Sequence, residues 1–194
     1  LSKRLQSLSP SETLAMAQKS GELKAQGFDV INMSVGEPDF STPNHIKEAA
    51  KSAIENNFSF YSPVPGFIEL RKAICAKLKK ENNLAFEPTQ IVVSNGAKQS
   101  LSNVLLSLID KGDEVIIPAP YWVSYPEMVK LAEGTSVIVS AGIEQDFKIT
   151  AQQLEDTITE KTKAFILCSP SNPPGSVYSK EELKSLADVL AKYP

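Results

Sequence analysis

Apolar residues in the second half of the chain fall into short runs that alternate with longer stretches of helical spacing. The short runs lack strict alternation of apolar and polar positions, as is typical of parallel strands buried on both faces. They are Ile91–Val93, Val115–Ile117, Val137–Val139 and Ala164–Leu167. Between and after them, apolar residues recur at helical intervals, which predicts amphipathic helices. These helices pass through Leu101–Leu108, Met128–Leu131, Leu154–Ile158 and Lys180–Lys192, the last with Leu183, Leu186, Ala187 and Leu190 facing inward.

The first half of the chain reads as helices separated by irregular loops. Pro10 followed by helix-forming residues predicts a helix from about Ser11 to Ala25. Thr42 and Pro43 predict the start of another, with Thr42 as N-cap. Val30–Met33 is a short strand-like run. A further helix carries one apolar stripe of Phe67, Leu70, Ile74 and Leu78.

Strands that alternate with helices indicate right-handed crossovers between parallel strands. We therefore expect an α/β fold with a mostly parallel sheet and helices on both of its faces. Residues 1–30 precede this pattern and read as an arm. The chain stops after the helix that runs to Lys192, where another strand is due, so we expect it to be a piece of a larger protein.

The composition limits the classes of binding partner that we expect for this chain. A net charge of −3 over 194 residues gives no reason to expect nucleic acid or an anionic membrane. No apolar run approaches the roughly 20 residues of a membrane helix. Cys75 and Cys168 suit a reducing cytoplasm without a disulfide framework. The single His45 has no neighbours at metal-ligand spacing, so no metal is expected.

The loop Ser169–Gly175 is the strongest candidate for chemistry. It follows a buried apolar run, and open parallel sheets bind ligands at the carboxyl ends of their strands. Pro173 biases Asn172 away from the helical region, and Gly175 can take a positive φ. The loop would hold one carboxamide rigidly toward a crevice; the alternative is a proline-rich turn without chemistry.

Three other positions carry weaker signals. Gly96-Ala97-Lys98 opens a helix after an apolar run, where free N–H groups and the helix dipole favour a phosphate. Dinucleotide and P-loop glycine motifs are absent from the sequence. Trp122 could stack on a planar ring, or it could be a core aromatic. Gly36 and Tyr61 lie on proline-containing loops, where simple turns or loop packing would also explain them.

Taken together, a phosphate-binding turn, an aromatic side chain that can stack and a carboxamide donor indicate a phosphorylated, planar, polar heteroaromatic ligand. Five motifs in this chain, in this order, resemble those of class I, fold type I pyridoxal-phosphate-dependent aminotransferases, most closely the bacterial aspartate aminotransferases. They are Ser34–Phe40, Phe60–Gly66, Asn95–Gln99, Pro120–Pro126 and Ser169–Gly175. Pro174 departs from the family, which more often has threonine there.

The resemblance implies a set of roles. The cofactor would be pyridoxal 5′-phosphate, with its phosphate held at Gly96, Ala97 and Lys98. Trp122 would stack on the pyridine ring, and Asn172 would donate to the ring's phenolate oxygen. Trp122, Asn172 and the Gly36 backbone would contact the substrate. Thr13 and Lys98 would lie near the substrate's distal carboxylate. Tyr61 would contact the cofactor phosphate bound by the other subunit of a homodimer.

The resemblance also implies a division and an activity. Residues 1–40 would form an arm and part of the small domain, and residues 41–194 the beginning of the large cofactor-binding domain. The reaction would move an amino group from an amino acid, first of all aspartate, to a 2-oxo acid, first of all 2-oxoglutarate. The family's Schiff-base lysine would lie beyond residue 194, so these residues would hold half a site and no catalytic base.

Alternatives stay open at this point. They are an aromatic aminotransferase, a carbon–sulfur lyase of the same fold, and a non-catalytic module that only binds the cofactor or dimerises. The resemblance further implies cis peptide bonds before Pro120 and Pro173, because both loops must aim a side chain at the cofactor.

Overall fold

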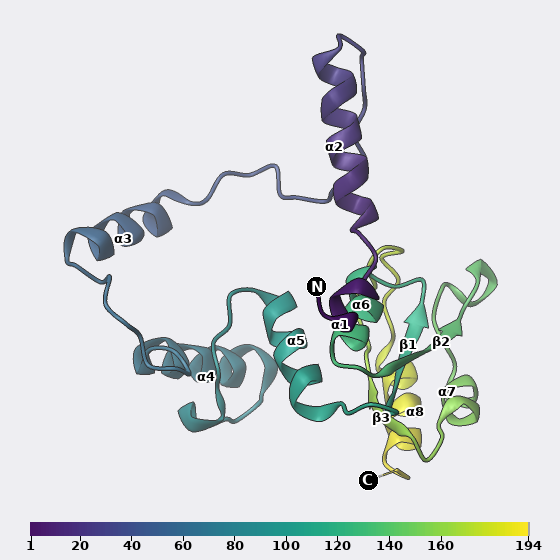
Figure 1. The fold of residues 1–194 in the computed structure, drawn as a ribbon. Coiled ribbons are helices and arrows are strands. Elements are labelled where there is room, and N and C mark those ends of the chain that lie inside the picture. The colour runs from purple at the N-terminus through teal and green to yellow at the C-terminus, as the bar shows by residue number, and fades with distance from the viewer. Residues whose placement is uncertain (194) are drawn as a thin grey trace. The chain divides into compact units, whose positions relative to one another are not determined.

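A computed structural model describes residues 1–193, and the chain divides into two compact units. Unit 1 joins residues 1–11 to the chain from Lys98 onward, and unit 2 is Glu12–Ala97. Unit 1 contains α1 (Lys3–Gln6), α5 (Ala97–Leu108, all but its first residue), β1 (Glu114–Ala119), α6 (Ser124–Leu131), β2 (Thr135–Ser140), α7 (Ala151–Thr157), β3 (Thr162–Phe165) and α8 (Lys180–Leu190) (Figure 1). Unit 2 contains α2 (Glu12–Ala25), α3 (Asn44–Glu55), α4 (Ile68–Asn82) and the 3₁₀ turn Pro88–Gln90.

The centre of unit 1 is a parallel sheet, as the strand pattern predicts. Within the described residues it has three strands in the order β2-β1-β3, with β1 in the middle. Val115, Ile116 and Ile117 of β1 have 0% exposed surface, because both faces of the strand are covered. This burial explains why β1 is a continuous apolar run rather than an alternating one.

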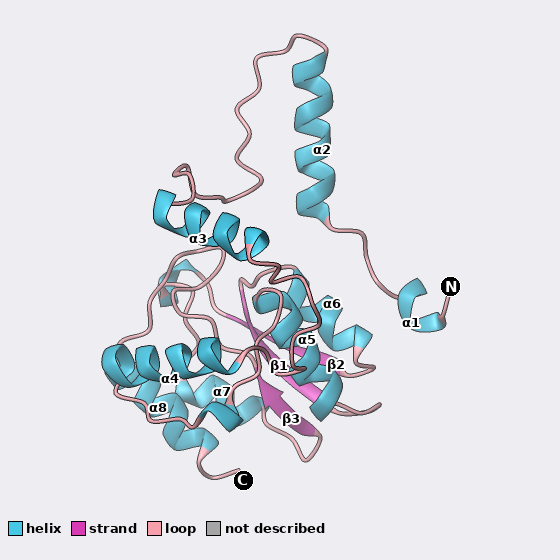
Figure 2. Ribbon diagram, turned by 90° about the vertical axis from the view of Figure 1, so that its left-hand side faces the viewer, coloured by secondary structure: helices cyan, strands magenta, loops and turns pink. Residues whose placement is uncertain are grey.

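Helices cover both faces of this sheet, which confirms the predicted α/β layering (Figure 2). On one face Leu105 of α5 and Met128 and Val129 of α6 pack against Val115 and Ile117. On the other face Ile116 packs among a second group that α7 and α8 provide. That group includes Leu154, Leu186 and Val189. The central strand therefore presents alternate residues to two separate apolar cores.

Caps in the sequence fix where two of these helices begin. Thr150 accepts a hydrogen bond from the Gln153 N–H at the start of α7, and Ser179 accepts one from the Glu182 N–H at the start of α8. In each case the third helical residue bonds back to the cap, which completes a capping box. Such caps satisfy N–H groups that have no partner inside the helix.

Some sequence predictions are wrong in detail. In α8 the buried residues are Leu186 and Val189, whereas Leu183, Ala187 and Leu190, all predicted to face inward, are exposed. In α5 the apolar residues recur at helical spacing, but Leu105 is buried and Leu101 half-buried, whereas Val104 and Leu108 are about half exposed. The N-cap of α3 is Pro43 rather than Thr42, and it makes no side-chain cap.

Two predicted strands are irregular segments instead. Ile91–Val93 and Val30–Met33 have no ladder partner among residues 1–193, and a strand needs a neighbour to satisfy its backbone. The Val93 N–H donates to the Pro65 carbonyl at 3.1 Å, which is a single link between two loops. Ile31 is 85% and Met33 91% exposed, so most of this run is not packed as a core strand would be.

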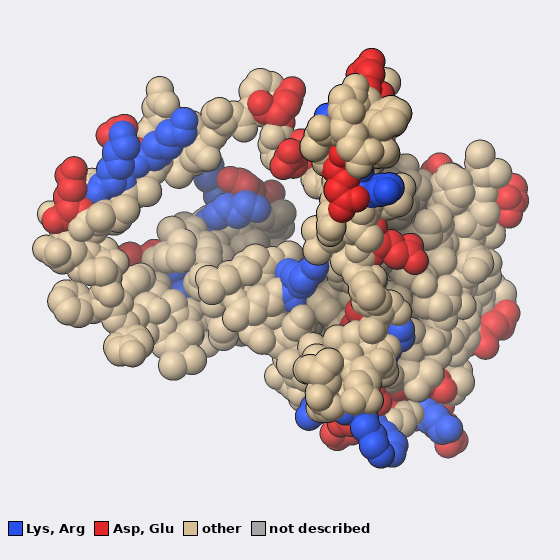
Figure 3. Space-filling view, turned by 45° about the horizontal axis from the view of Figure 1, so that its top comes forward, with Lys and Arg blue, Asp and Glu red and all other residues tan. Residues whose placement is uncertain are grey.

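In the described part of the chain, no helix has the length and apolarity to cross a membrane. Lys and Arg side chains mix with Asp and Glu on the visible face rather than gathering into a field of one sign (Figure 3). This pattern agrees with the modest net charge of −3.

Candidate functional site

The carboxyl end of β1 turns through proline-containing backbone to deliver Trp122. The Ala119–Pro120 peptide bond is cis, as predicted. Trp122 is half-buried and packs against the core on the α5 and α6 face of the sheet. Tyr125, one turn further along, presents its ring edge to the indole, with the centroids 5.5 Å apart and the planes at 89°. This edge-to-face contact fixes the indole against α6.

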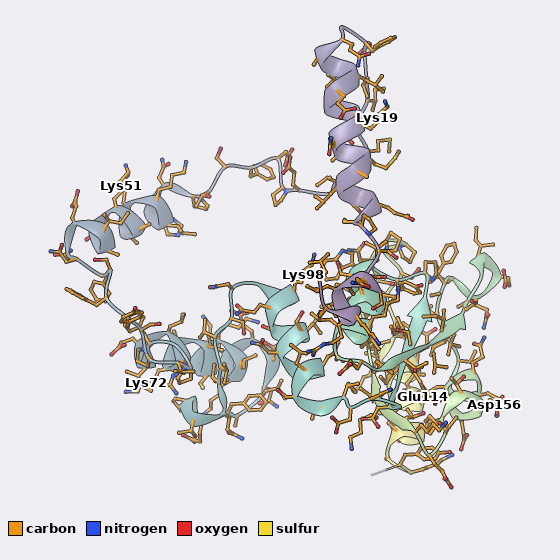
Figure 4. The ribbon with its side chains drawn as sticks, viewed as in Figure 1. Lys19, Lys51, Lys72, Lys98, Glu114 and Asp156 are labelled. Carbon is orange, nitrogen blue, oxygen red and sulfur yellow. The ribbon has the colours of Figure 1, made fainter. Side chains whose placement is uncertain are left out.

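Lys98 meets Trp122 from the start of α5. Its ammonium nitrogen lies 4.8 Å from the centroid of the indole ring, which is a cation–π contact. Figure 4 labels Lys98 at this end of the helix. The residue is exposed, so its charge remains accessible to a ligand. Two of the predicted site residues are therefore in direct contact.

The loop after β3 is held by its own hydrogen bonds, as the sequence predicts for a rigid carrier of Asn172. The Ser171 N–H donates to the Ser176 carbonyl at 2.8 Å, and the Gly175 N–H to the Ser171 carbonyl at 2.8 Å. Gly175 has a φ of 80°, which suits a residue without a Cβ. Asn172 itself is exposed on this closed loop.

The same loop contains two cis peptide bonds. The predicted one, before Pro173, is present. A second precedes Pro170, and the sequence prediction missed it because nothing local separates this Ser-Pro pair from a trans one. The Tyr178 N–H, which follows the loop, donates to Ser169 Oγ at its start at 3.1 Å and so closes the loop across its base.

Asn172 shares a small pocket with residues that follow β1 and β3. The pocket is lined by Pro118, Pro120, Tyr121, Tyr125, Phe147, Ile166, Leu167, Cys168, Ser171, Asn172 and Tyr178. Its cavity volume of about 10 Å³ is near the minimum that one water molecule needs. The walls therefore lie close together, and they bring the loop of Asn172 next to Tyr125 of α6, the helix that begins just after Trp122.

Tyr125 and Cys168 make this connection, and the sequence prediction missed both. Burial, together with a hydrogen bond to Cys168, raises the pKa of the Tyr125 hydroxyl to about 12, so the phenol stays neutral. Cys168 Sγ also donates to the Pro170 carbonyl at 3.2 Å. A signal was present in the spacing, because Tyr125 is one helical turn from Trp122 and Cys168 directly precedes the loop of Asn172.

The turn before α5 has the features of an anion site. Gly96 has a φ of +87°, and a Cβ added there would meet no heavy atom within 4 Å, so the backbone is open to a ligand. The Gly96 N–H already donates to the Ser94 carbonyl at 2.9 Å. Ala97 and Lys98 lie in the first turn of α5, whose N–H groups have no partners within the helix. That turn contains no acidic residue to compete with an anion.

The other predicted site residues belong to unit 2. Thr13 is half-buried on α2, Gly36 is exposed in an irregular segment, and Tyr61 is fully exposed on its loop. Within unit 1, Lys98 contacts Trp122, and Tyr125, which packs against Trp122, lines the same small pocket as Asn172. Thr13, Gly36 and Tyr61 are not brought to these residues within one unit.

The donor set fits a phosphorylated, planar heteroaromatic group. Helix N–H groups suit the phosphate, a half-buried indole suits the flat ring, and an exposed carboxamide suits a ring oxygen. Among residues 1–193, no group of three or more His, Cys, Asp or Glu is placed to hold a metal ion.

This fold and these residues define a class of protein. The chain belongs to the class I and II aminotransferases, whose family model matches residues 29–194. Over 194 residues it is 55% identical to the aspartate/prephenate aminotransferase of Nitrosomonas europaea, covering 100% of this chain and 49% of that protein. It is 52% identical to the enzyme of the same name from Cereibacter sphaeroides, covering 100% and 48%.

Solved structures agree on the fold. The aspartate aminotransferase of Rhizobium meliloti superposes with a TM-score of 0.95 at 42% identity, over 100% of this chain and 48% of that one. The Thermus thermophilus aspartate aminotransferase with maleate superposes with a TM-score of 0.96 at 44% identity, over 99% and 50%. The fold is therefore the α/β fold of these enzymes, and the chain spans about half the length of the relatives it matches.

Proposed function

We propose that the protein to which this chain belongs is a pyridoxal-phosphate-dependent aminotransferase. It would move the amino group of aspartate to 2-oxoglutarate. The observation that carries the proposal is the contact of Lys98 with Trp122, whose neighbour Tyr125 lines one pocket with Asn172. Membership of the aminotransferase family and the names of the relatives support it.

When bound, the cofactor supplies the electron sink that amino-group transfer requires. The chain's own residues bind and orient it. The N–H groups of Ala97 and Lys98, next to Gly96, hold the phosphate, and Trp122 covers one face of the ring. Asn172 donates a carboxamide N–H to the ring oxygen. Because a loop closed by its own hydrogen bonds carries Asn172, the donor is already in position when the ring arrives.

Substrate contacts follow from the same residues. The Gly36 backbone, Trp122 and Asn172 would contact the amino acid. Thr13 and Lys98 would lie near its distal carboxylate. Relatives are named for aspartate and prephenate, and the Thermus enzyme was solved with maleate, a dicarboxylate. Aspartate and prephenate both carry a second carboxylate, so prephenate is a second candidate substrate, with Lys98 as the cation that receives it.

The proposal includes an assembly and a location. Residues 1–40 would close over the substrate as an arm and small-domain segment, and residues 41–194 would begin the large domain. Tyr61 would reach the phosphate of the partner subunit in a homodimer, which suits its full exposure on a loop of unit 2. The free cysteines, Cys75 and Cys168, suit a cytoplasmic protein.

The test is Asn172→Ala in the full-length holoenzyme. The carboxamide stabilises negative charge on the ring oxygen, and a hydrogen bond to a charged group contributes about 1.5–3 kcal/mol. Without this hydrogen bond, the bound cofactor should hold more tightly the proton whose loss its absorbance reports. We expect the pKa read from the cofactor's absorbance to rise by about one unit, and kcat/KM to fall.

Asn103→Ala is the matched control, because Asn103 is exposed on α5 and lies outside the proposed site. It should leave the absorbance titration unchanged. An unchanged or lowered pKa in Asn172→Ala would mean that this carboxamide does not contact the ring oxygen. The central assignment of the site would then be wrong.

A further inference from the structure

Arg71 links two segments of unit 2 that the proposed function assigns to phosphate binding. It lies on α4, half-buried. Its Nε donates to the Gly66 carbonyl at 3.2 Å, at the end of the loop that carries Tyr61. Its Nη1 donates to the Pro88 carbonyl at 2.9 Å, in the segment that leads to Gly96. One guanidinium thus bridges two loops that are distant in sequence.

A second set of contacts joins the same two segments. The Val93 N–H donates to the Pro65 carbonyl at 3.1 Å. Gly66 lies so close to Val93 that an added Cβ would be 2.8 Å from Val93 Cγ2. Gly66 also has a φ of +93°, which favours glycine on its own account. The two loops are therefore in direct van der Waals contact beside the Arg71 bridge.

The chemistry of the bridge requires arginine. The planar guanidinium offers donors in a fixed fork, so a single side chain can reach two carbonyls in different directions. A lysine ammonium keeps the charge but lacks this fork. The base of the fork is α4, a helix of 15 residues that begins directly after the Gly66 segment.

We propose that Arg71 is a positioning residue, which fixes the Tyr61 loop against the segment that ends in the phosphate-binding turn. This inference rests on the proposed function, in which Gly96–Lys98 hold the phosphate of one site and Tyr61 reaches the phosphate of the partner subunit's site. A single Arg71 bridge would then set the geometry of a phosphate group in both sites of the dimer.

The experiment uses the full-length protein freed of cofactor and measures the affinity for pyridoxal 5′-phosphate and for unphosphorylated pyridoxal. Arg71→Gln and Arg71→Lys are the variants. Lys72→Gln is the control, because Lys72 is the exposed neighbour on the same helix (Figure 4). We expect both Arg71 variants to lose about tenfold in the preference for the phosphorylated ligand, as one charged hydrogen bond would give. Pyridoxal affinity should stay within about twofold in both variants.

Equal losses for the two ligands would show that Arg71 supports the fold in general, and no loss would show that the bridge has no role; either result overturns the inference. If Arg71→Gln does not fold, Arg71→Lys decides, since it retains the charge and the helix. Tyr61→Phe combined with Arg71→Lys adds a further test: the double variant should lose less than the sum of the two single losses, and additive losses would argue against positioning of Tyr61 by Arg71. A wild-type protein that does not prefer the phosphorylated ligand would instead refute the proposed function.

Discussion

Lys98 should discriminate between acidic and aromatic substrates, and the structure allows the size of the effect to be worked out. The ammonium lies 4.8 Å from the Trp122 centroid at an exposed site, where a cation–π contact contributes about 0.5–1 kcal/mol. A hydrogen bond between charged groups contributes about 1.5–3 kcal/mol. Moving the ammonium from the indole to a substrate carboxylate therefore gains about 1–2 kcal/mol, since the first contact is given up for the second.

The perturbation is Lys98→Met, which keeps an unbranched side chain beside the indole and removes the charge. For aspartate, kcat/KM should fall about 5–30-fold, the equivalent of about 1–2 kcal/mol. For phenylalanine, which has no distal carboxylate, the change should stay within about twofold. The ratio of the two values reports the distal contact alone, because any general damage to the site affects both substrates.

The assay follows the first half-reaction of the full-length holoenzyme by the cofactor's absorbance, so that no second dicarboxylate is present. Lys111→Met is the control, because Lys111 is exposed and follows the other end of α5. Equal losses for aspartate and phenylalanine would refute the reasoning. They would show that Lys98 is a solvated surface lysine with no part in substrate choice.

Three further predictions concern the full-length protein's stability to urea. Tyr125→Phe removes the hydroxyl that bonds Cys168 but keeps the ring against the indole; it should cost about 0.5–1.5 kcal/mol, and no loss would mean the bond contributes nothing. Leu154→Ala empties a fully buried position and should cost about 2–5 kcal/mol, whereas a cost below about 1 kcal/mol would contradict the packing. A hydrogen bond from Lys148, with a smaller one from a backbone N–H, lowers the pKa of Glu182 below its ordinary value of 4.5. A lowered pKa gives stability that is present above pH 4.5 and lost as the pH falls through the lowered value. Glu182→Gln should therefore be less stable than wild type at neutral pH, and a difference that persists in acid would argue against the ion pair.

The sheet could be predicted from sequence because short apolar runs alternate with helical stretches along the second half of the chain. A run such as Val115–Ile117, apolar on both faces, is stable only where helices cover both sides of a sheet. Ile91–Val93 has the same composition but no ladder partner within residues 1–193, and apolar character alone does not reveal whether a neighbouring strand exists. The cis bonds before Pro120 and Pro173 followed from the family resemblance, not from local sequence.

Some residues of the candidate site could be predicted from the sequence and others could not. Trp122 and Asn172 could be predicted because each follows a short apolar run that forms a strand, and parallel strands end at one edge of a sheet. The pair of Tyr125 and Cys168 could not be predicted with equal ease. Their contact depends on how a helix after β1 packs against the loop after β3, and tertiary packing of that kind leaves no periodic trace in the sequence.

The close approach of Gly66 to Val93 makes the two positions unequal in the substitutions they can accept. Shrinking Val93 to alanine would remove the side-chain atoms nearest Gly66 and demand no change in return. Substitution of Gly66 remains unfavourable even after Val93 has been made smaller, because any side chain at position 66 must still adopt a φ of +93°. Position 93 can therefore vary before position 66, where the positive φ continues to favour glycine whatever residue stands at position 93.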